Sequence, residues 1–266
     1  MKRKHQREIE LDDTLDEGSR PAKLSRPSIL HEDADFFVVS KPVGIFFRGG
    51  LFDDPSISEF LAAEYEIDEE SFETVYPLDP DISGLMVVAR NESTRDRLIA
   101  QFDSREMSVT YLALIRGMVM TDRGSLEKAV TLPKSGRVKV VAEHGAPART
   151  DWRIRDSFIG FALLECTPRT RHEQQIRAHL HDAGMPLAVD VQHGGAESLK
   201  LSSFKGGYRH SRRHPERPLI SRPTIHASKV EFKHPNSGKE IAVECPPPKD
   251  FKATLYQLDR FGRIGK

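Results

Sequence analysis

The stretch that decides the fold is YPLDPDISGL at residues 76–85, which continues directly into MVVA at residues 86–89. Its acidic residue, Asp79, stands between Pro77 and Pro80, just before a run with the composition of a buried strand. Catalytic groups are often carried by loops that rigid strands hold in place, and the two proline rings restrict the backbone around Asp79. The stretch therefore predicts a carboxylate held in a fixed direction. An ordinary turn, in which Asp79 bonds to its own backbone, explains the same residues.

The segments around this loop have the patterns of short strands with a few helices between them. We expect strands at residues 36–39, 85–89, 109–115, 151–154, 161–166, 225–232 and 241–244, and helices at 58–65, 93–102, 174–183 and 250–259. Ser93 with Asp96 three residues later predicts a capping box at the start of the second helix. Hairpin-like spacings predict an α+β fold, with a mixed, largely antiparallel central sheet and flanking helices.

Length and composition set limits on the class of protein. Residues 1–26 are charged and almost free of aromatic side chains, which predicts a disordered tail, and residues 27–266 are expected to form one domain. No window approaches the roughly 18 apolar residues of a membrane helix. The two cysteines, Cys166 and Cys245, lie in apolar runs. They predict buried, reduced thiols in a cytoplasmic protein, without a disulfide framework.

Charge is distributed unevenly along the chain. Residues 1–133 carry 16 Lys and Arg against 26 Asp and Glu, whereas residues 134–266 carry 24 against 14. Residues 200–222 are especially basic and include Arg212, Arg213 and the aromatic Tyr208. A basic loop with an aromatic side chain suits a phosphate backbone and a stackable base. A solvated surface loop accounts for this segment equally well.

Several other kinds of site receive little support. His172 begins a segment like the His-Glu-x-x-His zinc helix, but the second ligand is replaced by Ile176, so no metal is expected. Asp79 and Asp81 could serve as the carboxylate pair of a glycosidase, although the chain has one tryptophan, Trp152, as a platform for a sugar. The Gly-Gly pairs lack the Lys-Ser/Thr continuation of a phosphate-binding loop.

A further constellation is spread along the chain: Asp79 before its strand, Tyr111 on the strand at 109–115, and Arg177 on the helix at 174–183. Taken singly, each has a structural explanation. Their surrounding segments, however, form a series of short motifs that follow one another along the chain. These motifs are 29–33 with 37–44, Leu78-Asp79 with 83–85, 111–114 with Gly117, 175–180 with 184–187 and Asp190, and 226–227 with 232–235 and Gly238. With these segments the chain resembles the pseudouridine synthases of the RluA type over most of residues 29–258.

The resemblance implies an RNA pseudouridine synthase that isomerises a uridine in ribosomal or transfer RNA, acts as a monomer and needs no cofactor. It implies that Asp79 acts as nucleophile or base on the ribose and that Arg177 holds Asp79 ionised. Tyr111 would stack on the detached uracil, with its hydroxyl assisting proton removal. Ile176 would form an apolar wall, and Leu78 would also contact the substrate.

The chain departs from the family pattern beside Asp79. Pro77 stands where relatives carry an Arg that handles the RNA around the flipped base, and Ile82 stands where they carry a Thr. Arg212 and Arg213 are the expected phosphate contacts in the basic loop. The departures leave open a second function, an RNA-binding protein that kept the synthase fold and lost the reaction.

Overall fold

The computed structural model describes residues 26–49, 56–76, 78–132, 136–209 and 214–264. The expected tail, apart from its last residue, lies outside the described residues, as do Pro77, Arg212 and Arg213. The extent of the domain therefore stays a prediction.

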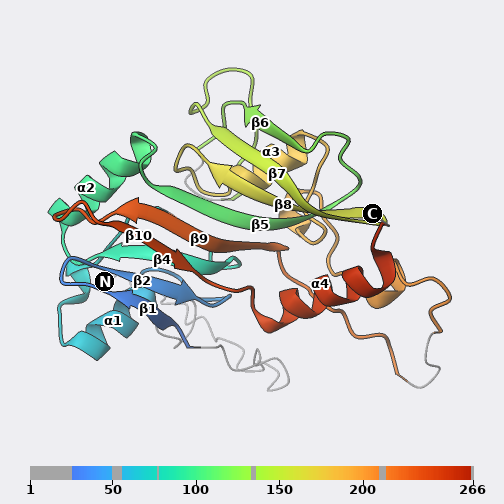
Figure 1. Ribbon diagram of the computed structural model, residues 1–266, viewed down its shortest axis with the longest axis horizontal. Coiled ribbons are helices and arrows are strands. Elements are labelled where there is room, and N and C mark those ends of the chain that lie inside the picture. The colour runs from blue at the N-terminus through green and yellow to red at the C-terminus, as the bar shows by residue number, and fades with distance from the viewer. Residues whose placement is uncertain (1–25, 50–55, 77, 133–135, 210–213, 265–266) are drawn as a thin grey trace, which may run out of the picture.

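One mixed sheet runs through the described part of the molecule (Figure 1). Its strands are β1 (Ser28–Glu32), β2 (Phe36–Lys41), β3 (Glu73–Thr74), β4 (Ser83–Ala89), β5 (Ser108–Arg116), β6 (Arg123–Glu127), β7 (Arg149–Phe158), β8 (Phe161–Pro168), β9 (Ile225–Lys233) and β10 (Glu240–Glu244). The order across the sheet is β1-β2-β4-β9-β5-β8-β7-β6, with β10 paired to β9 and β3 paired to β4. Among the described strands every pairing is antiparallel except that of β4 with β9. The predicted α+β class is confirmed.

Helices cover the sheet at both ends. They are α1 (Ile57–Tyr65), α2 (Glu92–Asp103), α3 (Gln175–Asp182) and α4 (Lys249–Gly262), with short 3-10 turns η2 (Glu69–Ser71), η3 (Val191–His193) and η4 (Leu201–Ser203). Figure 1 shows α1 at the lower left beside β1 and β2, α2 at the upper left above β10, α3 beside β7 and β8, and α4 at the lower right. All four residues of 36–39 and all of β4 are buried. These strands read as continuous apolar runs because both of their faces are covered.

The start of α2 differs from the prediction. Asn91, and not Ser93, caps the helix: its side chain accepts a hydrogen bond of 2.9 Å from the backbone N–H of Thr94. Asn91 is extended (φ −162°, ψ 163°), as a cap residue requires, whereas Ser93 is already inside the first turn. The capping box predicted from Ser93 and Asp96 is therefore wrong, because Asn is as good a cap as Ser and stands two residues earlier.

The parallel contact between β4 and β9 fixes the chain just after Asp79. Gly84 has φ of +128°, and a Cβ there would lie 2.2 Å from the carbonyl oxygen of Ala227, so only glycine permits this approach. Next to it the Ser83 hydroxyl donates to His226 Nδ1 at 2.9 Å, while His226 Nε2 donates to the carbonyl of Cys245 at 2.9 Å. The first residues of β4 are thus anchored on β9.

Candidate active site

The loop that carries Asp79 is a defined turn whose own contacts hold it. The backbone N–H of Ile82 donates to the carbonyl of Asp79 at 3.0 Å, and Gly44 N–H donates to the carbonyl of Pro80 at 2.8 Å. The Asp79 side chain is 10% exposed. The carboxylate is consequently directed inward, while Asp81, two residues on, is exposed.

Arg177 of α3 is the charge partner of Asp79. Its Nη1 lies 2.7 Å from Asp79 Oδ2, and its side chain is 3% exposed. The same guanidinium donates from Nε and Nη2 to the two carboxylate oxygens of Asp190, each at 2.8 Å, and from Nη2 to Gln192 at 3.1 Å. Burial lowers the pKa of Arg177, but the hydrogen bonds and charges of Asp190 and Asp79 outweigh it and raise that pKa. Arg177 is therefore a permanent cation with fixed orientation.

Asp190 is a member of the site that was not among the predicted site residues. Its side chain is fully buried and forms the bidentate pair with Arg177. Burial raises the pKa of Asp190, but hydrogen bonds from Arg177 and His193 oppose it, and the pKa falls well below its usual range. Asp190 also caps η3 by accepting from the backbone of His193 at 3.2 Å. The signal for it in the sequence was its place after the 184–187 segment.

Tyr111 reaches the same place from β5. It is 6% exposed, and burial, followed by the charge of Asp79, raises its pKa well above the usual value of a phenol. A phenol with this pKa is protonated at neutral pH. Its ring is thus available for stacking, and its hydroxyl acts as a neutral hydrogen-bond donor.

A cavity joins these residues. It encloses about 480 Å³ of empty space, including its open mouth, and Leu78, Asp79, Tyr111, Ile176 and Arg177 are among its lining residues. Tyr76, Ile82, Phe102, Val109 and Ile225 add apolar surface to it. The structure thus brings together five of the seven predicted site residues; the other two, Arg212 and Arg213, lie outside the described residues. Asp81 does not line this cavity, which counts against a paired carboxylate.

Lys41, at the end of β2, is a buried cation behind the Asp79 loop. It is 1% exposed, and its Nζ donates to the carbonyls of Pro42 (3.1 Å), Ile45 (3.0 Å) and Pro80 (2.9 Å). Burial lowers the pKa of Lys41 to about 7, against the charges of Asp79 and Asp81, which raise it. Its hydrogen bonds to three carbonyls use every donor of an ammonium group. Lys41 falls within the 37–44 segment of the family resemblance, but no role in the site was predicted for it.

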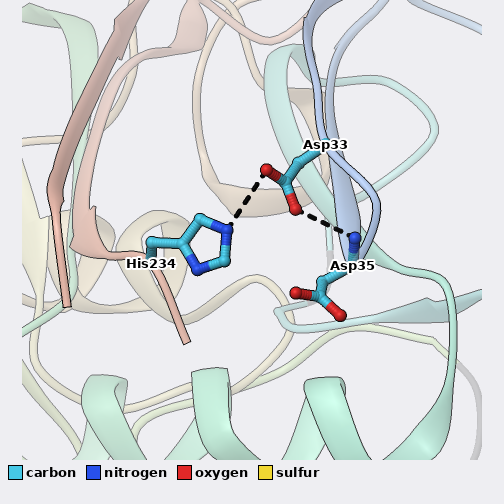
Figure 2. Close-up of side chains that lie close together, drawn as sticks. All are labelled: Asp33, Asp35 and His234. Carbon is cyan, nitrogen blue, oxygen red and sulfur yellow. Dashed lines mark hydrogen bonds and ion pairs between the residues drawn. The ribbon is translucent and has the colours of Figure 1, made fainter. Parts of the chain in front are cut away.

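One group of potential metal ligands occurs among the described residues: Asp33, Asp35 and His234 (Figure 2). His234 Nδ1 accepts from the backbone N–H of Asn236 at 3.0 Å, so the proton is on Nε2, which donates to Asp33 at 3.2 Å. Asp33 also accepts from the backbone N–H of Asp35 at 2.9 Å. The group is explained as a hydrogen-bonded link between the β1–β2 and β9–β10 turns.

Comparison with known proteins defines the class. A family model described as RNA pseudouridylate synthase matches residues 35–182, more than half of the chain. The chain therefore belongs to the RNA pseudouridine synthase family, whose enzymes are intramolecular isomerases. The described fold and the family match agree with the resemblance seen in the sequence.

The relatives come from bacteria and plants. The chain is 31% identical over 235 residues to ribosomal large subunit pseudouridine synthase C of Salmonella typhi, covering 86% of this chain and 69% of that protein. It is 34% identical over 201 residues to the rice protein named RNA pseudouridine synthase 2, chloroplastic, covering 69% of this chain and 44% of the rice protein. The chain thus spans less than half of the rice relative.

Solved structures show the same fold. Human RNA pseudouridylate synthase domain containing 4 superposes with a TM-score of 0.63 at 20% identity, covering 90% of this chain and 94% of that one. Human RNA pseudouridylate synthase domain containing 1 gives a TM-score of 0.62 at 20% identity, covering 86% and 87%. Within the described residues, no helix combines the length and apolar character needed to cross a bilayer.

Proposed function

We propose that this protein converts a uridine of ribosomal RNA into pseudouridine, with Asp79 as the catalytic carboxylate. The observation that carries the proposal is the 2.7 Å pair of Arg177 with Asp79 in a cavity that Tyr111 also lines. The names of the bacterial relatives support large-subunit ribosomal RNA as the target. Transfer RNA is the alternative.

The reaction rearranges bonds without adding or removing atoms. The bond between ribose C1′ and uracil N1 breaks, a bond between C1′ and C5 forms, and the proton on C5 is transferred to the released N1 through solvent or side chains. Because electrons and atoms balance within the nucleotide, the proposal includes no cofactor. The nucleotide must leave the base stack to enter the cavity, which costs a few kcal/mol.

Asp79 acts on the ribose in this proposal, either as a nucleophile at C1′ or as a base that takes a ribose proton. Either role requires an ionised carboxylate. The buried guanidinium of Arg177 supplies the favourable charge at 2.7 Å, and Asp190 keeps that guanidinium in place.

Tyr111, Ile176 and Leu78 would hold the base. All three line the cavity, and an aromatic ring can retain a detached uracil by stacking while it turns. Because burial and the charge of Asp79 raise the pKa of Tyr111 well above its usual value, we assign its hydroxyl to hydrogen bonding with the base. Proton removal from C5 is better assigned to Asp79 or to solvent.

The rival function is RNA binding without catalysis. Its support is Pro77 and Ile82 in place of the family's Arg and Thr; Ile82 is 5% exposed and lines the cavity as an apolar surface. A protein that only binds RNA has no need for an Asp79–Arg177–Asp190 arrangement, so we favour catalysis.

The test is to incubate the purified protein with large-subunit ribosomal RNA and transfer RNA transcribed in vitro, and to map pseudouridine at nucleotide resolution. We expect pseudouridine with the wild type and with Asp81→Asn, and a loss of at least a thousandfold in rate with Asp79→Asn. RNA binding without pseudouridine dependent on Asp79 would establish the rival. Equal losses in the two variants would show that Asp81 is as necessary as Asp79 and would contradict a single catalytic carboxylate.

Phosphate contacts by Arg212 and Arg213 stay part of the proposal. Replacing both with Gln should weaken RNA binding and make the dependence of log Kd on log salt concentration less steep by roughly two phosphate contacts. An unchanged slope would show that these two residues do not contact RNA phosphates.

A further inference from the structure

Arg171 is a lining residue of the cavity and has no assigned role. It lies between β8 and α3 and lines the cavity, as does Phe102 near the end of α2. Its one ion pair among the described residues joins its Nε to Oδ1 of Asp103, the last residue of α2, at 3.4 Å. The pair therefore links the segment before α3 to the end of α2.

This pair is weaker than the other pair in the cavity. The Arg171–Asp103 contact uses one nitrogen at 3.4 Å, with the two side chains 27% and 63% exposed. The Arg177–Asp79 contact is 2.7 Å long, with side chains 3% and 10% exposed. Charge-assisted hydrogen bonds are ordinarily about 2.7–2.9 Å long, and exposed pairs contribute little to stability. Arg171 can therefore exchange Asp103 for another anion at little cost.

Charge balance gives a reason for that exchange. Two carboxylates, Asp79 and Asp190, share the single guanidinium of Arg177, so Arg177 has no spare positive charge to offset an incoming phosphodiester. The arginines that line the cavity are Arg171 and Arg177, and Arg177 is fully engaged. His172 also lines it, but its Nε2 lies 3.0 Å from the carbonyl of Pro147. Among the described residues that line the cavity, Arg171 is the arginine that remains to bind a phosphate.

We propose that Arg171 binds a backbone phosphate beside the uridine in the cavity, and that Asp103 occupies the guanidinium until RNA displaces it. The inference rests on the proposed function. Asp103 competes with the RNA phosphate for the guanidinium of Arg171. It keeps Arg171 oriented in the free protein and lowers the affinity of the protein for RNA. Its position in the last turn of α2 is unfavourable for a carboxylate, because the helix dipole is negative there. Loss of the Asp103 charge should therefore leave the helix intact.

The test compares Arg171→Gln, Asp103→Asn and the double variant, using the RNA transcript that the wild type modifies, or large-subunit ribosomal RNA if none is modified. The measurements are Kd over a range of salt concentrations and the single-turnover rate at saturating protein. Arg95→Gln is the matched control: Arg95 is 24% exposed and ion-paired on the same helix, and it does not line the cavity.

We expect Arg171→Gln to raise Kd about tenfold and to reduce the salt slope by about one phosphate contact, with a single-turnover rate within about threefold of wild type. Asp103→Asn should lower Kd about threefold, and this gain should vanish in the double variant. If Arg171→Gln behaves like Arg95→Gln while the wild type modifies RNA, the inference fails and the proposed function stands. If the wild type binds RNA in an Arg171-dependent way without modifying it, the proposed function fails and the inference stands.

Discussion

The ammonium of Lys41 donates a 2.9 Å hydrogen bond to the carbonyl oxygen of Pro80, 39 residues further along the chain. This contact joins the end of β2 to the loop that carries Asp79. The same carbonyl accepts from Gly44 N–H, so the turn after β2 and the Asp79 loop form one hydrogen-bonded unit. The direction of the Asp79 carboxylate therefore depends on a residue from a different strand.

Replacing Lys41 should loosen this unit. Lys41→Met keeps the apolar stem and removes three hydrogen bonds to carbonyls, so we expect the unfolding free energy to fall by about 2–4 kcal/mol. The single-turnover rate of pseudouridine formation should fall about tenfold, with RNA Kd nearly unchanged. Denaturant titration and rapid-quench kinetics measure both. Lys128→Met, at a side chain that is 61% exposed and paired with Asp182, should change neither; equal effects from the two would contradict the assignment.

Asp190 should matter through the position of Arg177. Asp190→Asn leaves a buried guanidinium with one anionic partner, and breaking a buried pair costs about 3–5 kcal/mol. We expect the single-turnover rate to fall at least tenfold. The control is Asp250→Asn, since Asp250 forms a bidentate pair with Arg222 (2.8 and 2.9 Å) but is 39% exposed and lies outside the cavity. A loss of activity in Asp250→Asn as large as in Asp190→Asn would show that both act only through stability.

His226 should make stability depend on pH. Burial lowers its pKa from 6.5 to about 4, against the hydrogen bond to the carbonyl of Cys245, which raises it. Between pH 6.5 and 4, His226 therefore binds a proton in the unfolded chain but not in the folded chain. Unfolding free energy should consequently fall as the pH falls through this window, by about 3 kcal/mol from this group.

The measurement is denaturant unfolding at several pH values for wild type and His226→Gln. In the variant the decline between pH 6.5 and 4 should be shallower by the contribution of one group. Identical pH profiles would show that His226 is not held neutral in the folded protein.

Gly84 should tolerate no side chain. Gly84→Ala places a methyl group 2.2 Å from the carbonyl oxygen of Ala227 at a φ of +128°, and the expected cost is at least about 3 kcal/mol with a loss of activity. Gly160 has a φ of +75° and nothing within 4 Å of an added Cβ. Gly160→Ala thus tests the backbone term alone, about 1–2 kcal/mol. The check is thermal unfolding of both variants. Equal destabilisation by Gly84→Ala and Gly160→Ala would show that the close approach of β4 and β9 does not cause the effect at Gly84.

The order of strands and helices was largely predictable because each segment carries its own period. Residues 36–39 and 109–115 are apolar or β-branched runs, residues 225–232 mix apolar with polar side chains, and each segment became part of a strand. The cap of α2 was missed, since Asn91 and Ser93 are both good cap residues and the choice depends on where the chain leaves β4. The parallel pairing of β4 with β9 was not predictable either, because no local pattern marks which strands from distant segments become neighbours.

The sequence by itself determined that Asp79 precedes a buried strand on a proline-restricted loop, and that Tyr111 and Arg177 stand in segments of a recognisable order. Only the tertiary structure decided what Asp79 contacts. Arg177 lies 98 residues away in the chain and 2.7 Å away in space, and its bidentate bond to Asp190 and the support from Lys41 have no local signature. The physical reason is that helices and strands depend on the pattern of residues close together in the sequence. The pairing of buried charges depends instead on how the sheet brings separate segments together.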